Sequence, residues 1–359
     1  MKKTRNSGSR KRRVRGRKPY SKAVRGLVIT AISLLSIMSL FFICIGVYAL
    51  GKIGLVKFGP QGSGDFIDSL IPDYVSGVEE VSDYSSIEDG AASISEIPVR
   101  TNTKSVKNIL LLGVDSRTGS YSSTLADAIM ILTIDSKNKS IKLTSLMRDT
   151  LVTLPGRDRN GDGRDDYAKL NAAYAYGGFD LMYKTIEQNF RLRINQHITI
   201  NFDAFRAAVN AMGGIDIELT AAEARAIKIA NSGGKYHLNG NYALKYARLR
   251  KLAGDDFQRT SRQRTVIKAL FEKAKKMSIG KLNTVLNEIL PQVYTNMTRN
   301  EFTMFTINSL NYFGYSMDDT FRIPPDREFS YKSIKGIGSV LLLNDPAKTI
   351  TGLHQFIYM

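Results

Sequence analysis

The feature that most constrains this chain is an apolar segment near its start, residues 26–51, which contains no charged residue. As a helix it would be about 39 Å long, enough to cross the roughly 30 Å hydrocarbon core of a bilayer with some tilt. Residues 1–25 carry twelve Lys and Arg and no Asp or Glu. Because basic flanks stay in the cytoplasm, we expect a cytoplasmic tail at 1–25, a transmembrane helix at 26–51 and the remaining chain outside the cell.

Two other interpretations of this start are weaker. A cleaved signal peptide is one, since Val47-Tyr48-Ala49 loosely resembles a cleavage site. The apolar run is, however, well beyond the usual length of roughly 7–15 residues. Nucleic-acid binding by the basic tail is the other, but no aromatic interleaving or helix-turn-helix pattern accompanies it. A topology signal that also contacts anionic lipid fits the tail better, so we expect no specific nucleic acid as partner.

Composition excludes several classes of protein. The 359 residues are 43% hydrophobic and 23% charged, as in a folded chain. A single Cys excludes an intramolecular disulfide and a thiolate-rich metal site. The three histidines are far apart and form no HExxH pair, which argues against a zinc hydrolase.

The exterior part divides in two. Residues 52–104 are rich in Ser, Gly and acidic residues and are expected to form a linker with little to bury. Beyond it, short apolar runs indicate strands at 109–114, 128–134, 141–146, 198–202 and 214–219. Helical periodicity follows at 171–189, 204–212, 221–230, 242–250 and 261–277. We therefore predict one α/β domain over 105–359, with a mixed central sheet flanked by helices. Within it, 336–343 is expected to be a turn and a strand.

Two carboxylates stand at expected strand ends. Asp115 follows one apolar run and Asp127 precedes another. If the two strands are neighbours, the carboxylates meet at one sheet edge and can bind Mg²⁺ (or Mn²⁺) together with phosphate oxygens. The alternative is that each Asp caps a turn.

Arginines form a second set of candidates near expected element ends. They are Arg117, Arg148, Arg248, Arg250, Arg259 and Arg262. The planar guanidinium suits phosphate oxygens, although a solvated basic surface would have the same composition. A metal together with several arginines is what diphosphate chemistry requires.

Several segments together resemble the LytR-CpsA-Psr family of cell-wall polymer ligases. The matching segments are NILLLGVDSR (108–117), Ala126-Asp127, SLMRDT (145–150), KLNAAYAYGG (169–178), GGID (213–216), YARLR (246–250) and Asp256, Arg259, Arg262 and Gln263. Each is weak alone, but their order and spacing hold over roughly 107–275, and the combination is specific. A basic tail followed by an anchor also agrees with the family.

The resemblance implies a fold, an activity and a set of site residues. The family has an α/β domain with a long apolar pocket for a polyprenyl chain. Its members use Mg²⁺ to transfer a glycopolymer (teichoic acid, capsular or related polysaccharide) from an undecaprenyl-diphosphate carrier onto peptidoglycan. Asp115 and Asp127 would bind the metal. The diphosphate would be bound by Arg148, Lys169, Arg248, Arg250, Arg259 and Gln263. The location would be the cell membrane of a Gram-positive type envelope.

The resemblance also raises questions about individual residues. Leu125 stands where the family usually has Arg, so a phosphate contact is missing or comes from a neighbour such as Arg117. Beside Arg148, which we expect to act in catalysis, Asp149 would be either the general base or, as we prefer, the residue that orients the Arg148 fork. A non-catalytic binder of lipid-linked polymer and a membrane-bound transcriptional regulator or attenuator are the alternatives; the second would need a DNA-reading module in a tail of only 25 residues.

A second metal site is suggested by DRNGDG at 158–163. Asp158, Asn160 and Asp162 would offer oxygens at the alternate positions of a Ca²⁺ loop, with Gly163 at the sixth. Its twelfth position is Lys169 and not the bidentate Glu, so a Gly/Asp turn is the simpler interpretation.

Overall fold

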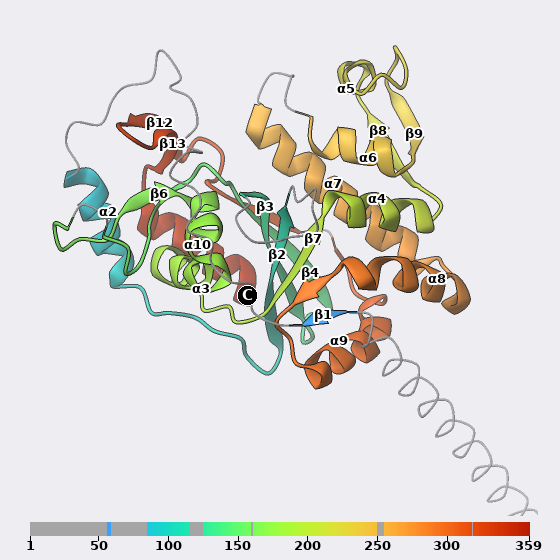
Figure 1. Cartoon of the computed structure of the whole chain (residues 1–359), viewed down its shortest axis with the longest axis horizontal. Helices are drawn as coiled ribbons and strands as arrows, with labels where there is room; N and C mark the ends of the chain where they lie inside the picture. The colour runs from blue at the N-terminus through green and yellow to red at the C-terminus, as the bar shows by residue number, and fades with distance from the viewer. Residues whose placement is uncertain (1–55, 59–84, 115–124, 159–160, 250–254, 318) are drawn as a thin grey trace, which may run out of the picture. The chain divides into compact units, whose positions relative to one another are not determined.

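The computed structural model describes residues 56–58, 85–114, 125–158, 161–249, 255–317 and 319–359 (Figure 1). The anchor expected at 26–51 lies outside these ranges. Within them, no helix combines the length and apolar character needed to cross a bilayer.

A mixed sheet of seven strands forms the centre of the described fold, as the sequence predicts. In spatial order the strands are β1 (Lys57–Phe58), β10 (Tyr294–Thr295), β7 (His197–Asn201), β2 (Val106–Val114), β3 (Ala126–Asp135), β4 (Ser140–Leu146) and β11 (Thr320–Ile323). β3 runs antiparallel to both β2 and β4, whereas β7 is parallel to β2 and β11 is parallel to β4. The last residues of four strands and the start of β3 therefore meet at one edge.

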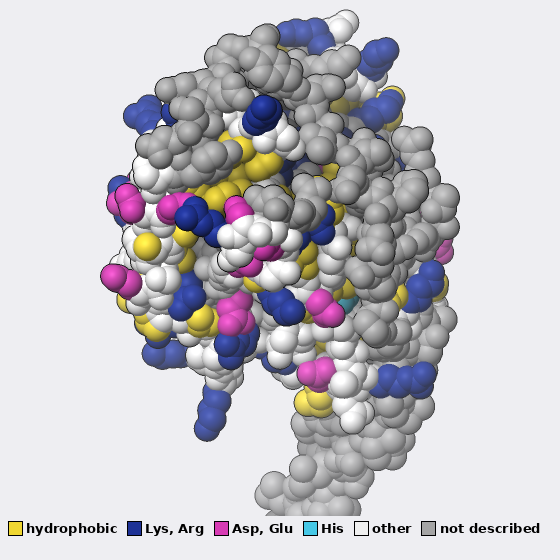
Figure 2. Space-filling view, turned by 60° about the vertical axis from the view of Figure 1, so that its left-hand side comes forward, with side chains coloured by type: hydrophobic (Ala, Val, Ile, Leu, Met, Phe, Trp, Pro, Cys, Tyr) yellow, Lys and Arg dark blue, Asp and Glu magenta, His cyan; other side chains and the backbone are white. Residues whose placement is uncertain are grey.

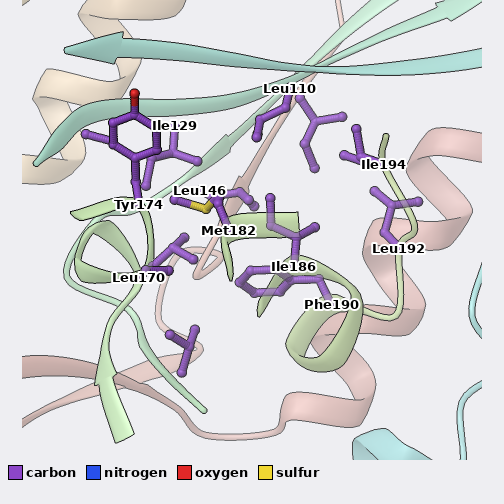
Figure 3. Close-up of a cluster of buried hydrophobic side chains, with 14 of the residues drawn as sticks. Leu110, Ile129, Leu146, Leu170, Tyr174, Met182, Ile186, Phe190, Leu192 and Ile194 are labelled. Carbon is purple, nitrogen blue, oxygen red and sulfur yellow. The ribbon is translucent and has the colours of Figure 1, made fainter. Parts of the chain in front are cut away.

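One face of the sheet is covered by α2 (Ser85–Ser95), α3 (Leu170–Phe190) and α10 (Pro346–Tyr358). Figure 3 shows the core between this face and α3. The side chains there are almost fully buried: Leu110, Ile129, Leu146, Met182, Ile186 and Phe190. Each contributes roughly 1.5–3 kcal/mol through burial.

The opposite face is covered by a second helical layer (Figure 1). It consists of α4 (Phe202–Ala211), α6 (Gly240–Ala247), α7 (Asp255–Lys275), α8 (Ile279–Ile289), the short helix η1 (Leu290–Gln292) and α9 (Arg299–Tyr312). Ile109 and Leu143 point to this layer, whereas Leu110 and Leu112 point to α3. Because both faces are covered, the central strands β2 and β3 contain long apolar runs.

Two segments differ from the expected arrangement. The strand expected at 214–219 is β8 (Ile215–Leu219), which among the described strands pairs with β9 (Gly234–Leu238) alone and lies outside the main sheet. The helix expected at 221–230 is α5 (Ala221–Ala226), which begins with a capping box between Thr220 and Glu223 and ends early.

The linker expected at 52–104 contains a packed helix. Ile87 and Ile94 of α2 are buried, two helical turns apart on one face. The Ser- and acid-rich composition of the segment conceals this short apolar stripe.

Two hairpins complete the described fold beside β4. They are β5 (Leu151–Thr153) with β6 (Tyr167–Lys169), and β12 (Phe329–Ile334) with β13 (Gly338–Leu343). The turn and strand expected at 336–343 are confirmed, with Gly336 and Gly338 in left-handed conformations that favour glycine.

Charge is mixed on the face shown in Figure 2, where described basic and acidic side chains are interspersed around a strip of hydrophobic ones. The chain's formal net charge of +18 comes largely from residues 1–25, which lie outside the described ranges.

Candidate active site

A β-bulge sets the position of Asp127 at the functional edge of the sheet. Gly113 of β2 pairs with Ala128, but the next residue, Val114, pairs with Ala126. Asp127 is therefore the extra residue on β3. A bulge redirects a side chain and is common beside active sites.

Four charged residues from three segments meet at this edge, and we call them the charged cluster. Arg148 donates from Nη1 to Oδ1 of Asp127 at 3.0 Å and from Nε to Oδ2 of Asp149 at 3.2 Å. Lys169 approaches the other oxygen of Asp149, with an Nζ–Oδ1 distance of 3.2 Å. The exposed fraction of these side chains is between 12% and 23%, which is low enough to strengthen their electrostatic attraction and leaves them open to a ligand.

The backbone around Arg148 is bound on three sides. Met147 N–H donates to the carbonyl of Ile323 in β11 at 2.8 Å. The carbonyl of Arg148 accepts from Asn171 N–H at the start of α3, at 3.1 Å. The carbonyl of Asp149 accepts from Leu341 N–H in β13, at 2.9 Å. Arg148 and Asp149 are therefore held by the scaffold before any ligand arrives.

An apolar pocket of about 210 Å³ lies between the sheet and the second helical layer. Its lining comes from β2, β3, β7, α4, α6 and α7 and includes Leu111, Gly113, Ala128, Met130, Ile200, Phe205, Leu244 and Val266. Asn201, Arg248 and Gln263 are the polar residues of this lining. The guanidinium carbon of Arg248 lies 4.2 Å from the ring centroid of Phe202, which begins α4 directly after β7. Such a pocket suits an apolar chain with an anionic head.

The charged cluster and the pocket are adjacent. Ala128 lines the pocket and directly follows the bulged Asp127. Asn201, also in the lining, is the last residue of β7 and pairs with Val114 at the same edge. Among the described residues, the charged cluster therefore lies beside an apolar pocket.

Other expected site residues have different surroundings. Arg259 is almost fully buried within α7, at 3% exposure. Arg262, part of the matching motif, donates from Nε to Glu223 at 2.8 Å and from Nη1 to the Leu249 carbonyl at 3.0 Å. Burial opposes ionisation of Glu223, but its bonds to Arg262 and Thr220 hold its pKa below the usual value. Arg262 is therefore a structural residue that fixes α7 to α5.

Three expected site residues, Asp115, Arg117 and Arg250, lie outside the described residues. Leu125, at the position where the resemblance leads us to expect Arg, is half-buried immediately before β3. Among the described residues, no three His, Cys, Asp or Glu side chains are grouped so as to hold a metal ion.

In the loop proposed for Ca²⁺, Asp158 accepts backbone N–H bonds from Gly161, Asp162 and Gly163. This is the contact pattern of a turn, and it fits the simpler interpretation. Asn160 lies outside the described residues. Calcium binding stays a prediction.

One half-buried cation, Arg264, was missed by the sequence analysis. Arg264 donates from Nη1 to Ser145 Oγ at 2.9 Å, near the end of β4. Burial, aided by nearby Arg322, lowers its pKa to about 10. The spacing of Arg264, Ile267 and Phe271 in the sequence places them on one face of α7 and could have indicated this contact. In the structure, Ile267 and Phe271 pack toward β4.

Comparisons with known proteins give matches in family, sequence and fold. The LytR_cpsA_psr family model matches residues 74–323. A relative from Bacillus cereus named polyisoprenyl-teichoic acid–peptidoglycan teichoic acid transferase TagU is 31% identical over 292 residues, which are 81% of this chain and 90% of the relative. The Bacillus subtilis transferase TagV is 29% identical over 265 residues, or 68% of this chain and 66% of TagV. The crystal structure of B. subtilis TagV superposes with a TM-score of 0.54 at 28% identity, covering 71% of this chain and 98% of that one.

Proposed function

Because this chain belongs to the LytR_cpsA_psr family, we propose that it is a transferase that moves a glycopolymer from a polyprenyl-diphosphate carrier onto peptidoglycan. The observation that carries the proposal is the charged cluster of Asp127, Arg148, Asp149 and Lys169 beside an apolar pocket. The names of the relatives, teichoic acid transferases, favour a teichoic acid or a similar anionic polymer as the group transferred.

The donor would lie across both parts of the site. Its polyprenyl chain would enter the pocket, where apolar side chains replace water. Its diphosphate would then reach Arg248 and Gln263 at the pocket and Arg148 and Lys169 at the edge. The further expected phosphate ligands are Arg117, Arg250 and Arg259. Cations near a diphosphate stabilise both its ground-state charge and the charge that develops on the leaving group.

The reaction we propose is a displacement at phosphorus. A peptidoglycan hydroxyl oxygen bonds to the sugar-side phosphorus, and the bond from that phosphorus to the bridging oxygen breaks. Polyprenyl phosphate leaves with the electron pair, and the hydroxyl proton passes to solvent or to a base. Arg148 and Lys169 would offset the negative charge on the oxygens as the bonds exchange.

Asp149 is better suited to orientation than to proton abstraction. Its Oδ2 accepts from Arg148 and its Oδ1 faces Lys169, so each oxygen is engaged by a cation. Two bonded cations stabilise the ionised carboxylate and fix the direction of the Arg148 fork.

A divalent cation would complete the site. Asp127 supplies carboxylate oxygens, the donor type that Mg²⁺ and Mn²⁺ prefer, and with Asp115 it would hold the ion. A bound Mg²⁺ would supply further neutralisation of the diphosphate charge. Chelation is expected to abolish transfer, and added Mg²⁺ to restore it.

We further propose that residues 26–51 anchor the protein in the cell membrane, with the domain on the outer side. The length of the apolar segment and the basic charge before it support this orientation. The anchor would keep the domain near carriers that themselves reside in the bilayer.

Transfer by the purified full-length chain tests the function. Lipid-linked polymer and peptidoglycan are supplied with Mg²⁺, and Arg148→Ala and Asp127→Ala are compared with wild type. Each substitution is expected to reduce turnover by about 100-fold or more. Arg193→Ala is the matched control, because the Arg193 side chain pairs with Glu187 on the surface and its loss should leave turnover unchanged. Unchanged turnover in Arg148→Ala contradicts the assignment, and binding of the donor without turnover in wild type supports a non-catalytic binder.

A further inference from the structure

An open groove lined by aromatic side chains lies on the surface near the charged cluster, and we call it the aromatic groove. It encloses about 790 Å³, and its lining consists of Phe257, Gln258, Asp326, Arg327, Phe329 and Tyr331. These residues come from the start of α7, the loop after β11 and strand β12. Because the three segments are far apart in the sequence, the sequence analysis singled out none of the six residues.

The three rings form a continuous platform. Phe257 and Phe329 stack with their centroids 4.6 Å apart, and Tyr331 meets Phe329 edge-on at 5.4 Å. Tyr331 is 55% exposed, which is unusual for so large a ring among the described residues. An exposed aromatic ring beside polar groups is a feature of binding surfaces.

The aromatic groove is close to the charged cluster. Tyr331 pairs across the β12–β13 hairpin with Leu341, and Leu341 N–H donates to the carbonyl of Asp149 at 2.9 Å. Two strand spacings, roughly 10 Å, therefore separate the backbones of Tyr331 and Asp149.

The aromatic groove is also close to the apolar pocket. Phe257 precedes the pocket residue Gln263 by six positions on α7, an axial rise of about 9 Å. A ligand in the groove would thus border both parts of the active site.

The aromatic groove carries little net charge, with one acid, Asp326, against Arg327 of its lining and the neighbouring Arg322. Asp326 and Arg327 in its lining have opposite signs. Arg322, whose guanidinium carbon lies 4.3 Å from the Phe257 ring centroid, forms an ion pair with Asp326. A polyanionic donor polymer would prefer a larger surplus of cations than this single one, such as Arg148, Lys169 and Arg248 offer. The groove instead suits a ligand with flat apolar faces and uncharged polar groups around them.

We propose that the aromatic groove binds the glycan strand of the peptidoglycan acceptor. A pyranose ring can place its C–H face on Tyr331 and Phe329, while its hydroxyl and acetamido groups bond to Gln258 and Asp326. A strand bound there directs a sugar hydroxyl toward Arg148 and the sugar-side phosphorus of the donor. The inference rests on the proposed function for the identity of the acceptor, but binding of the glycan does not require turnover.

Titration of the full-length chain with a β-1,4-linked N-acetylglucosamine tetramer tests the inference, by calorimetry and without donor. Wild type is expected to bind the tetramer, and Tyr331→Ala to weaken binding by roughly fivefold, the usual worth of one stacked ring. Tyr331→Phe should retain most of the affinity, because the ring is kept. Met304→Ala is the control, since Met304 is equally exposed but lies on α9.

A second readout uses transfer kinetics. Tyr331→Ala is expected to raise the KM for peptidoglycan about fivefold, with kcat and the KM for donor unchanged. Absence of tetramer binding in wild type overturns the inference, and so does equal loss in Tyr331→Ala and Met304→Ala. A rise in donor KM alone would assign the groove to the polymer and also overturn it. If transfer fails in wild type but tetramer binding shows the expected pattern, the proposed function fails and the glycan site stands.

Discussion

At the scale of single residues, the contacts of Arg148 indicate the roles of the charged residues around it. Its guanidinium bridges Asp127 and Asp149, and Lys169 approaches Asp149 from the other side. Four alternating charges in one cluster hold each other in place and present two cations to an incoming diphosphate.

Asp149→Asn separates orientation from base catalysis. The amide oxygen can still accept from Arg148, so we expect turnover to fall only about tenfold, with the shape of the pH–rate profile unchanged. Measured kcat/KM between pH 5 and pH 9 is the test. Loss of the rising limb at acidic pH, together with a fall of about a thousandfold, would identify Asp149 as the base and contradict the orienting role.

A second prediction concerns the effect of His197 on the stability of the fold. It is almost fully buried, stacks on Phe179 with centroids 3.4 Å apart and is hydrogen-bonded to Tyr183. Burial lowers its pKa from 6.5 to about 3, so between these values the unfolded chain binds the proton and the folded chain does not. The free energy of unfolding should therefore fall as pH drops below about 6.5, by up to ~1.4 kcal/mol per pH unit.

Urea unfolding at pH 7, 6 and 5 measures this slope. His197→Asn lacks the titrating ring, so its slope should be smaller than that of wild type even though the variant is less stable throughout. Parallel slopes would show that His197 is not the group responsible.

At the scale of elements, sequence patterns located most strands and helices but not the irregularities that create the site. The apolar runs at 109–114 and 128–134 correspond to β2 and β3, because burial on both faces gives a readable pattern. The bulge at Asp127 depends on how β2 and β3 pair, which no local pattern reveals. For the same reason, β8 looked like a sheet strand but, among the described strands, pairs with β9 alone.

The helices show the same limit. Arg262 and Arg264 are two residues apart on α7, yet one bonds Glu223 and the other Ser145 on β4. A sequence motif cannot distinguish two such neighbouring arginines. The direction of each side chain shows that Arg262 is structural and that Arg264 lies near the functional edge of the sheet.

A prediction at this scale concerns the apolar pocket, which lies between the sheet and the helices α4, α6 and α7. The chain contains no Trp, so Phe205→Trp places a single fluorophore in the pocket lining. Emission is expected to shift to shorter wavelength when undecaprenyl phosphate displaces water from the pocket. Met304→Trp on the exposed side of α9 should not respond. An unchanged Phe205→Trp spectrum at saturating lipid would show that the tail binds elsewhere.

At the scale of the whole molecule, segments far apart in sequence build one edge. Residues after 280, which carry no motif, supply β10 and β11 to the sheet and the β12–β13 hairpin that binds Asp149. Their contribution arises from strand pairing between segments far apart in the sequence, which cannot be predicted from composition. The residues of the charged cluster, by contrast, lie in or beside the family motifs, so they could be named from sequence, whereas those of the aromatic groove could not.

The most direct test of the central claim is a crystal structure of the protein with undecaprenyl diphosphate. We predict that the polyprenyl chain lies between β3 and α7, against Ala128 and Val266, with the phosphates within hydrogen-bonding distance of Arg148 and Arg248. A polyprenyl chain outside this pocket, or a diphosphate at the opposite edge of the sheet, would contradict this prediction.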